Sequence, residues 1–304
     1  MRKLGLLLAL TLLVTAAPAQ SHPDWTTPLT PFRIAGNLYY VGSRDLAAYL
    51  IVTPAGNILI NSNLTSSPPL IRRSVEQLGF RWSDTRILLI SHAHNDHAGG
   101  SAQILRETHA RYMVMDADVP DIESGGRTDF ALGSAYWFPR AHVDRILRDG
   151  DTVFLGGTTL VAHKTPGHTP GCTTWTLRVS NRGTDGRGTD GRGTDDHGTP
   201  RNVVIVGGWS VLDEYRLVPT HAHPASYPGI AADFAHTFDV LAGLPCDIFL
   251  GAHGSYFNLL DKLARQPAQG ASVWIDPAGY QREVAAHRKL FEDILAKQRA
   301  AAKP

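Results

Sequence analysis

The sequence predicts the α/β fold class, with two β-sheets packed together and helices on their outer faces. Short runs of apolar and β-branched residues alternate with longer stretches whose apolar positions recur at helical spacing. Hairpin-like strands come early in the chain and strand–helix alternation follows, which indicates a layered fold with two sheets. The 304 residues are 43% hydrophobic and 19% charged, so the chain has enough apolar material for one sizeable core.

The expected strands are short β-type runs, and the expected helices lie between them or follow them. In the first half we expect strands at residues 37–42, 47–53, 57–61, 86–91 and 112–115, and helices at 68–78 and 99–109. In the second half we expect strands at 158–164, 173–179, 202–206 and 247–250, and helices at 230–241, 255–264 and 277–298. The last helix should pack one face on a sheet, because apolar residues recur among its Lys, Arg and Glu at Val284, Leu290, Ile294 and Leu295.

The first twenty residues have the pattern of a secretory signal peptide. Arg2 and Lys3 precede an apolar run at 4–14, and Ala17-Pro18-Ala19 offers a cleavage site. The run is shorter than the roughly 20 residues of a membrane-spanning helix, and no cysteine follows it for a lipid anchor. We therefore expect residues 1–20 to be removed and residues 21–304 to form a single periplasmic domain, monomeric and without a membrane anchor.

The charge balance argues against a nucleic-acid partner. The chain has 29 basic and 28 acidic residues and a net charge of +1. Without Arg2 and Lys3 the basic count falls from 29 to 27, so the mature chain is close to neutral. A protein that depends on phosphate contacts is normally more basic than this.

Residues 181–200 form a low-complexity insert. The pentapeptide Gly-Thr-Asp-Gly-Arg occupies 183–187, repeats at 188–192 and begins again at Gly193. The repeat has no apolar side chain to bury, so it cannot offset the entropy cost of ordering, and we expect a flexible loop between two neighbouring strands. A calcium-binding turn array is the alternative, which an Arg in each full copy disfavours.

A dense group of potential metal ligands occupies residues 92–97, where the sequence reads HAHNDH after an expected strand. Imidazole and carboxylate ligands suit zinc, and a loop between a strand and a helix can turn several of them toward one point. His92 and His94 can point the same way from an extended segment. Asp96 and His97 lie at the corner and can serve a second, adjacent metal. A polar surface loop is the alternative, which the density of such groups disfavours.

Two further histidines stand just past expected strands. His168 lies in the sequence TPGHTPG at 165–171, and His253 lies in FLGAHG at 249–254. The neighbouring glycines let the backbone bend close to an ion. Either histidine alone is typical of an ordinary loop, but with the 92–97 cluster they give six candidate ligands. Six ligands are enough for two zinc ions with open positions.

These residues resemble the metallo-β-lactamase superfamily, whose mark is His-x-His-x-Asp-His after a strand. Within it the chain resembles the subclass B3 metallo-β-lactamases, through TPGHTPGCTTW at 165–175, GGRTDF at 125–130 and LPCD at 244–247. The resemblance extends from about Phe32 to the C-terminal helix. It implies the metallo-β-lactamase fold, a four-layer αββα sandwich, with two Zn²⁺ ions in a groove between the sheets.

The resemblance also implies a role for each candidate ligand. One zinc ion would bind His92, His94 and His168, and the other would bind Asp96, His97 and His253. A hydroxide held between the ions and oriented by Asp96 would attack the carbonyl of a β-lactam, because coordination brings the pKa of water toward neutrality. The implied enzyme hydrolyses small-molecule antibiotics (penicillins, cephalosporins or carbapenems) and gives antibiotic resistance.

The chain departs from subclass B3 after the expected strand at 202–206. Subclass B3 enzymes often carry serines there that hold the carboxylate of the substrate, whereas this chain reads Gly207-Gly208-Trp209-Ser210. Ser210 is the candidate substrate-binding residue, with a turn-capping role as the alternative. The bulk of Trp209 argues against the substrate contact.

The two cysteines, Cys172 and Cys246, leave two interpretations open. An oxidising compartment would allow them to pair, whereas separated cysteines also occur as buried, unpaired hydrophobes. The resemblance favours free thiols, because the cysteines that usually pair with such residues in the family are missing from this chain.

Two other functions stay open at this point. A thioesterase or lactonase like glyoxalase II is the alternative within the superfamily. Those relatives usually bridge their metals with an aspartate at the position where this chain reads Gly207-Gly208-Trp209. The other alternative is a zinc-storing protein without catalysis. Such a protein would fill every coordination position of each ion with protein ligands, whereas three protein ligands per ion leave room for water and substrate.

Overall fold

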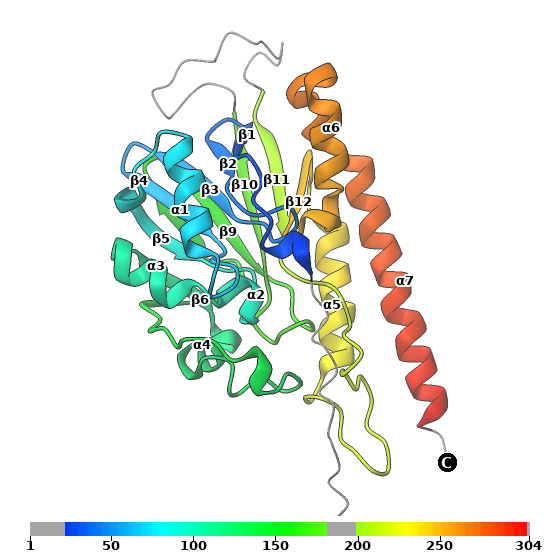
Figure 1. Cartoon of the computed structure of the whole chain (residues 1–304). Coiled ribbons are helices and arrows are strands. Elements are labelled where there is room, and N and C mark those ends of the chain that lie inside the picture. The colour runs from blue at the N-terminus through cyan, green and yellow to red at the C-terminus, as the bar shows by residue number, and fades with distance from the viewer. Residues whose placement is uncertain (1–21, 181–198, 303–304) are drawn as a thin grey trace, which may run out of the picture.

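Two β-sheets pack against each other and carry helices on both outer faces (Figure 1). The computed structural model describes residues 22–180 and 199–302. The larger sheet has seven strands in chain order: β1 (Phe32–Ala35), β2 (Leu38–Tyr40), β3 (Tyr49–Thr53), β4 (Gly56–Ile60), β5 (Thr85–Leu89), β6 (Arg111–Met115) and β7 (Arg145–Leu147). Strands β1 to β4 pair antiparallel, and β4 to β7 pair parallel.

The smaller sheet has five strands in the order β12-β11-β10-β9-β8: β8 (Thr152–Leu155), β9 (Thr158–Lys164), β10 (Thr173–Val179), β11 (Arg201–Val206) and β12 (Ile248–Gly251). Its pairs are antiparallel except β11 with β12. Alternating side chains of the larger sheet divide between two cores. Ile87 and Leu89 of β5 join the core shared with the smaller sheet, whereas Leu88 between them packs toward the helices.

Helices from the first half of the chain pack on the larger sheet, and helices from the second half pack on the smaller sheet. Packed on the larger sheet are α1 (Pro68–Gln77), α2 (Asn95–Ala98), α3 (Ser101–Thr108) and α4 (Val119–Ser124). Packed on the smaller sheet, at the right of Figure 1, are α5 (Ile230–Gly243), α6 (Leu259–Gln269) and α7 (Pro277–Ala301). Short 3₁₀ turns occupy Pro23–Trp25, Trp82–Asp84, Asp116–Asp118, Ser134–Tyr136, Gly254–Phe257 and Gly270–Trp274. The arrangement confirms the predicted four-layer αββα sandwich.

Most expected elements are present, and β9 and β10 have the predicted bounds. The structure adds β1, β7, β8, α2 and α4, all too short to give a clear pattern in the sequence. The prediction of one helix over 255–264 is wrong. Gly254–Phe257 forms a 3₁₀ turn, and Asn258 adopts a left-handed conformation with φ of 54° that a continuous helix does not allow. Helix α6 begins only after it, at Leu259.

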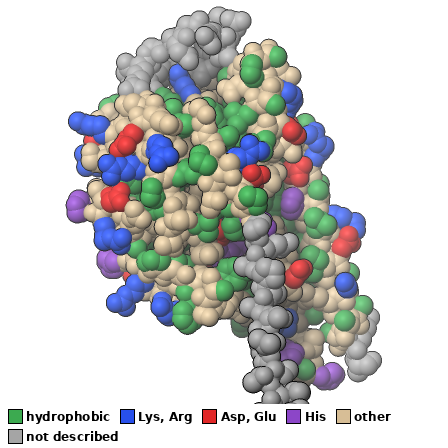
Figure 2. All heavy atoms as spheres, viewed as in Figure 1, with side chains coloured by type: hydrophobic (Ala, Val, Ile, Leu, Met, Phe, Trp, Pro, Cys, Tyr) green, Lys and Arg blue, Asp and Glu red, His purple; other side chains and the backbone are tan. Residues whose placement is uncertain are grey.

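The predicted signal peptide and residues 181–198 of the predicted insert lie outside the described residues. Cys172 and Cys246 are free thiols, as the resemblance implies. None of the described helices is long and apolar enough to cross a membrane. On the face drawn in Figure 2, basic and acidic side chains are interspersed.

Candidate metal centre

The candidate ligands come from three segments that follow strands. After β5 the backbone is extended at His94, and the single turn of α2 then carries Asp96 and His97. His168 lies in the loop between β9 and β10, and His253 follows β12. Each ligand therefore stands on a loop or a single helical turn that directly follows a strand of the sandwich.

Hydrogen bonds between the sheets hold the first two of these segments together. The backbone N–H of Thr173, at the start of β10, donates to the carbonyl of Ser91 at 2.7 Å. The indole N–H of Trp175 donates to the carbonyl of Ile90 at 3.0 Å. The end of β5 and the β9–β10 loop therefore meet at one edge of the sandwich.

The three residues predicted for a first metal form one group. His92, His94 and His168 are buried, and their candidate ligand atoms all lie within 4.8 Å of one another. The centroids of the three rings are 4.5 to 4.8 Å apart in each pair. The structure therefore brings His168 next to His92 and His94, which precede it by more than seventy residues in the sequence.

The three residues predicted for a second metal also converge. Oδ2 of Asp96 lies 3.2 Å from Nε2 of His97 and 3.5 Å from Nε2 of His253. The two imidazole nitrogens are 3.1 Å apart. His92 also forms a group with Asp96 and His97, whose ligand atoms lie within 4.8 Å of one another. The two sets of ligands are thus adjacent, with His92 in contact with both.

The nitrogen and oxygen atoms of this cluster are suitable ligands for a metal ion. Nε2 of His92 is buried without a hydrogen-bond partner among the described residues. A buried polar nitrogen without a partner is costly, and a bound cation would satisfy it. Imidazole nitrogens with one carboxylate oxygen are ligands that zinc accepts at about 2.0–2.2 Å.

Two rings of the cluster are oriented by acceptors behind them. Nδ1 of His168 donates to the carbonyl oxygen of Ser210 at 2.8 Å. Because a carbonyl can only accept, the proton of the neutral ring is on Nδ1 and Nε2 keeps its lone pair. Nδ1 of His253 lies 3.0 Å from Oδ2 of Asp45, which directs its Nε2 toward the cluster in the same way.

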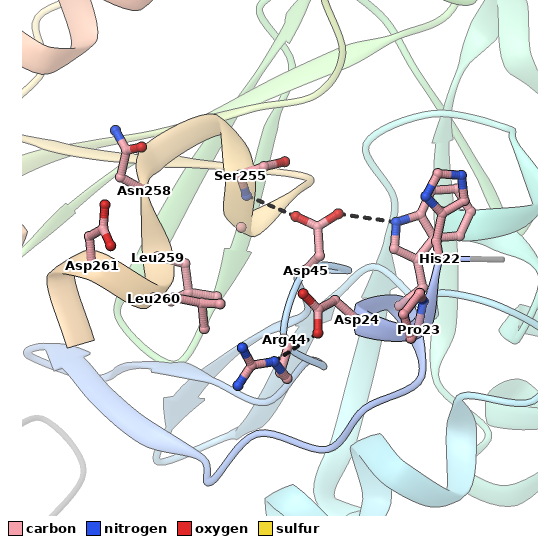
Figure 3. Close-up of a pocket in the computed structure, with 12 residues that line it drawn as sticks. His22, Pro23, Asp24, Arg44, Asp45, Ser255, Asn258, Leu259, Leu260 and Asp261 are labelled. Carbon is pink, nitrogen blue, oxygen red and sulfur yellow. Dashed lines mark hydrogen bonds and ion pairs between the residues drawn. The ribbon is translucent and has the colours of Figure 1, made fainter. Parts of the chain in front are cut away.

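Asp45 is a candidate site residue that the sequence pattern does not reveal. Its Oδ2 also accepts from the indole N–H of Trp25 at 3.1 Å, and its Oδ1 accepts from the N–H of Ser255 at 2.9 Å. Burial raises the pKa of Asp45, but the hydrogen bonds from His253 and Ser255 lower it to about 2. Figure 3 shows Asp45 bonded to Ser255 beside a cavity of about 430 Å³, with the Asp24–Arg44 pair nearby.

The ionisation states of His92, His168 and Asp96 suit ligation. Burial lowers the pKa of His168 to about 3 and holds the pKa of His92 well below its ordinary value. Both rings are therefore neutral at pH 7, the form that binds a metal. Burial raises the pKa of Asp96, but the neighbouring charge of His97 and the hydrogen bond with His253 outweigh it and hold the pKa well below its ordinary value. Asp96 is therefore an ionised carboxylate.

Solved structures of known enzymes are similar to this chain over most of its length. The native FEZ-1 metallo-β-lactamase from Legionella gormanii is 47% identical over 90% of this chain and 98% of its own, with a TM-score of 0.81. BJP-1, a subclass B3 metallo-β-lactamase of Bradyrhizobium japonicum, is 33% identical over 92% of this chain and 99% of its own, with a TM-score of 0.79. Residues 44–182 match the Metallo-beta-lactamase superfamily. The chain belongs to the metallo-β-lactamase superfamily.

Curated relatives are similar over shorter stretches. A protein named as a probable metallo-hydrolase, from Burkholderia pseudomallei, is 33% identical over 120 residues, which are 40% of this chain and 39% of the relative. A hydroxyacylglutathione hydrolase of Rhodopseudomonas palustris is 27% identical over 128 residues, 41% of this chain and 40% of the relative. The chain thus spans about two fifths of the length of these relatives. The superfamily and the histidine-rich cluster together identify a metallo-hydrolase.

The segment after β11, where the sequence departs from the subclass B3 pattern, packs closely against the candidate metal centre. A Cβ atom at Gly208 would lie only 2.6 Å from the ring of His168, so the close approach of this loop excludes a side chain there. Trp209 is buried and stacks on His287 of α7, with the ring centroids 4.1 Å apart. Ser210 is half-buried, and its side chain lowers the pKa of Tyr256, which burial raises. A role for Ser210 in substrate binding stays a prediction.

Proposed function

We propose that this chain is a di-zinc β-lactamase that hydrolyses the amide bond of β-lactam antibiotics. The observation that carries the proposal is the convergence of all six predicted ligands in two adjacent sets of three. Three protein ligands per ion leave positions for water and substrate, whereas structural zinc sites are closed by four. The similarity to solved metallo-β-lactamases over about nine tenths of the chain supports the same function.

In the proposed enzyme His92, His94 and His168 hold one zinc ion, and Asp96, His97 and His253 hold the other. Bound zinc supplies a Lewis acid and lowers the pKa of water, so that hydrolysis runs at neutral pH. The chain's own groups orient the reactants. The ionised carboxylate of Asp96 accepts a hydrogen bond from the attacking water and fixes its direction. The Ser210 carbonyl and Asp45 keep Nε2 of His168 and His253 turned toward the ligand cluster.

A thioesterase or lactonase is the alternative, because a hydroxyacylglutathione hydrolase is among the curated relatives. Such relatives usually bridge their metals with an aspartate after the strand that follows the His168-type loop. Here Gly207 and Gly208 occupy that place, and Gly208 packs directly against His168. A side chain on Gly208 would clash with the ring of His168, so an aspartate does not fit at this position. This favours the β-lactamase.

The proposal is tested by assaying purified mature protein against nitrocefin and imipenem, with S-lactoylglutathione and a homoserine lactone in parallel. We expect zinc-dependent hydrolysis of the β-lactams. Turnover of the thioester or the lactone without β-lactam turnover would instead support the alternative. Two bound zinc ions without hydrolysis of any of these substrates would indicate zinc storage.

The proposal includes export to the periplasm, where β-lactams act. The pattern of residues 1–20 supports it. Amino-terminal sequencing of protein from a periplasmic fraction should find a chain that begins close to residue 20. Full-length protein in the cytoplasm would contradict the proposed location.

A further inference from the structure

One buried carboxylate contacts both histidine-bearing loops without being a candidate ligand. Asp118 ends the 3₁₀ turn Asp116–Asp118 between β6 and α4 and is 1% exposed. Its Oδ2 accepts from the backbone N–H of Ala93 at 2.9 Å and from the hydroxyl of Thr169 at 2.8 Å. Its Oδ1 accepts from the backbone N–H of Gly171 at 2.7 Å.

These three donors lie beside the candidate ligands of one metal. Ala93 stands between His92 and His94, and Thr169 follows His168 directly. Asp118 therefore joins the loop after β5 to the loop between β9 and β10, at the point where the first set of three ligands converges. The packing is close, because a Cβ atom at Gly171 would lie 2.4 Å from the backbone nitrogen of Asp118.

The carboxylate also has no ion pair with Lys or Arg among residues 22–180 and 199–302. A buried carboxylate is stabilised by hydrogen bonds and by a nearby positive charge. Asp118 has the hydrogen bonds, and His94 is the neighbouring group whose positive charge favours its ionised form. A divalent ion held by His92, His94 and His168 would supply the cation that the carboxylate lacks.

We propose that Asp118 is a positioning residue that holds the two histidine loops in register for the first metal ion. This inference rests on the proposed function, because it requires that His92, His94 and His168 bind zinc. Asp118 touches neither metal nor substrate in this role. It sets the separation between the His92–His94 pair and His168, and therefore the affinity of the ion that they share.

The test replaces Asp118 with asparagine, which is almost the same size. An amide offers one acceptor oxygen, so its NH₂ group must face the N–H of Ala93 or of Gly171, and at least one donor loses its partner. Substituting a residue that orients metal ligands by hydrogen bonds typically weakens metal binding by about 10–100-fold. We expect the Asp118→Asn protein to bind one of its two zinc ions more weakly by this factor, measured by competition with a chromophoric chelator.

Asp116→Asn is the matched control, because Asp116 lies in the same 3₁₀ turn but pairs with Lys164 at an exposed position. Its stepwise zinc affinities should equal those of the wild type. The melting temperature of each metal-free protein is measured alongside. A merely structural role would lower that temperature in Asp118→Asn and leave both zinc affinities unchanged, which would overturn the proposal.

Thr169→Val keeps the inference testable if Asp118→Asn does not fold. Valine has the shape of threonine and removes only the hydroxyl donor to Asp118, so we expect a smaller weakening of the same zinc ion. Unchanged affinities in a folded Thr169→Val protein would contradict the positioning role. Absence of zinc from the wild-type chain would instead contradict the proposed function, and with it this inference, so the two failures are distinguishable.

Discussion

At the scale of single residues, the histidine rings are held by groups that do not themselves belong to the candidate ligands. The carbonyl of Ser210 and the carboxylate of Asp45 each accept from an Nδ1 atom and leave Nε2 facing the cluster. Such partners fix the tautomer and the direction of the ligand lone pair. Metal affinity should therefore depend on residues several ångströms from the ions.

Replacing Asp45 with asparagine should weaken the zinc ion held by His253. The amide keeps the size of the side chain but removes the negative charge that faces Nδ1 of His253, and we expect about a 10–100-fold loss of affinity. Stepwise zinc titration measures the effect. Asp24→Asn is the control, because Asp24 borders the same cavity and its carboxylate pairs with Arg44 rather than with a candidate ligand. Equal zinc affinities in Asp45→Asn and Asp24→Asn would contradict this role of Asp45.

Replacing Asp96 with alanine should remove one zinc ion and most of the turnover. Its Oδ2 is the oxygen that approaches both His97 and His253, so the second set of ligands loses its only carboxylate. Zinc counted per chain should fall from two to one, with β-lactam hydrolysis reduced by at least about 100-fold. An Asp96→Ala protein with two zinc ions and unimpaired turnover would refute the assignment.

The sequence predicts the six candidate ligands but not the residues behind them. His92, His94, Asp96 and His97 stand out because four potential metal ligands fall within six positions after a strand. Asp45 and Asp118 carry no such signal, since no histidine stands beside either one in the sequence and their partners are distant. Only the packing of the two sheets brings those partners together.

At the scale of elements, each ligand lies just past a strand because the sheets fix where the loops begin. The sequence predicts β9 and β10 with their observed bounds, since their β-branched runs are long and flanked by turn residues. It misses β7 and β8, the short edge strands where the two sheets end. It also merges a 3₁₀ turn with α6, because the left-handed Asn258 gives no pattern in its neighbours.

The attachment of α7 to α6 gives a prediction for stability. Asp276 caps α7 by accepting from the N–H of Gly279 at 2.9 Å, and it pairs at 3.1 Å with Lys262, which is 1% exposed. Asp276→Ala should lower the free energy of unfolding by about 3–5 kcal/mol, because it leaves a buried lysine unpaired. Urea titration of the metal-free protein measures this change.

Asp276→Ser separates the two contributions. Serine restores an N-cap acceptor but not the ion pair, so this protein should be more stable than Asp276→Ala by about 1 kcal/mol. If both proteins unfold at the urea concentration of the wild type, neither the cap nor the Lys262 pair stabilises the fold.

At the scale of the whole molecule, the metal centre lies where the two sheets meet, so bound zinc should stabilise the folded chain. A ligand present at 100 times its Kd adds ~2.7 kcal/mol. For a chain of this size each kcal/mol raises Tm by roughly 2–4 °C, so we expect a rise of at least about 5 °C. Calorimetry with zinc, and then with excess chelator, checks this rise. The same Tm in both conditions would show that the folded chain does not bind zinc.

A crystal structure with anomalous difference maps recorded on both sides of the zinc absorption edge would show directly whether the chain binds two zinc ions. We expect two peaks per chain, one within bonding distance of His92, His94 and His168, and the other within bonding distance of Asp96, His97 and His253. A single peak, or peaks that leave His168 or His253 outside the coordination sphere, would contradict this expectation.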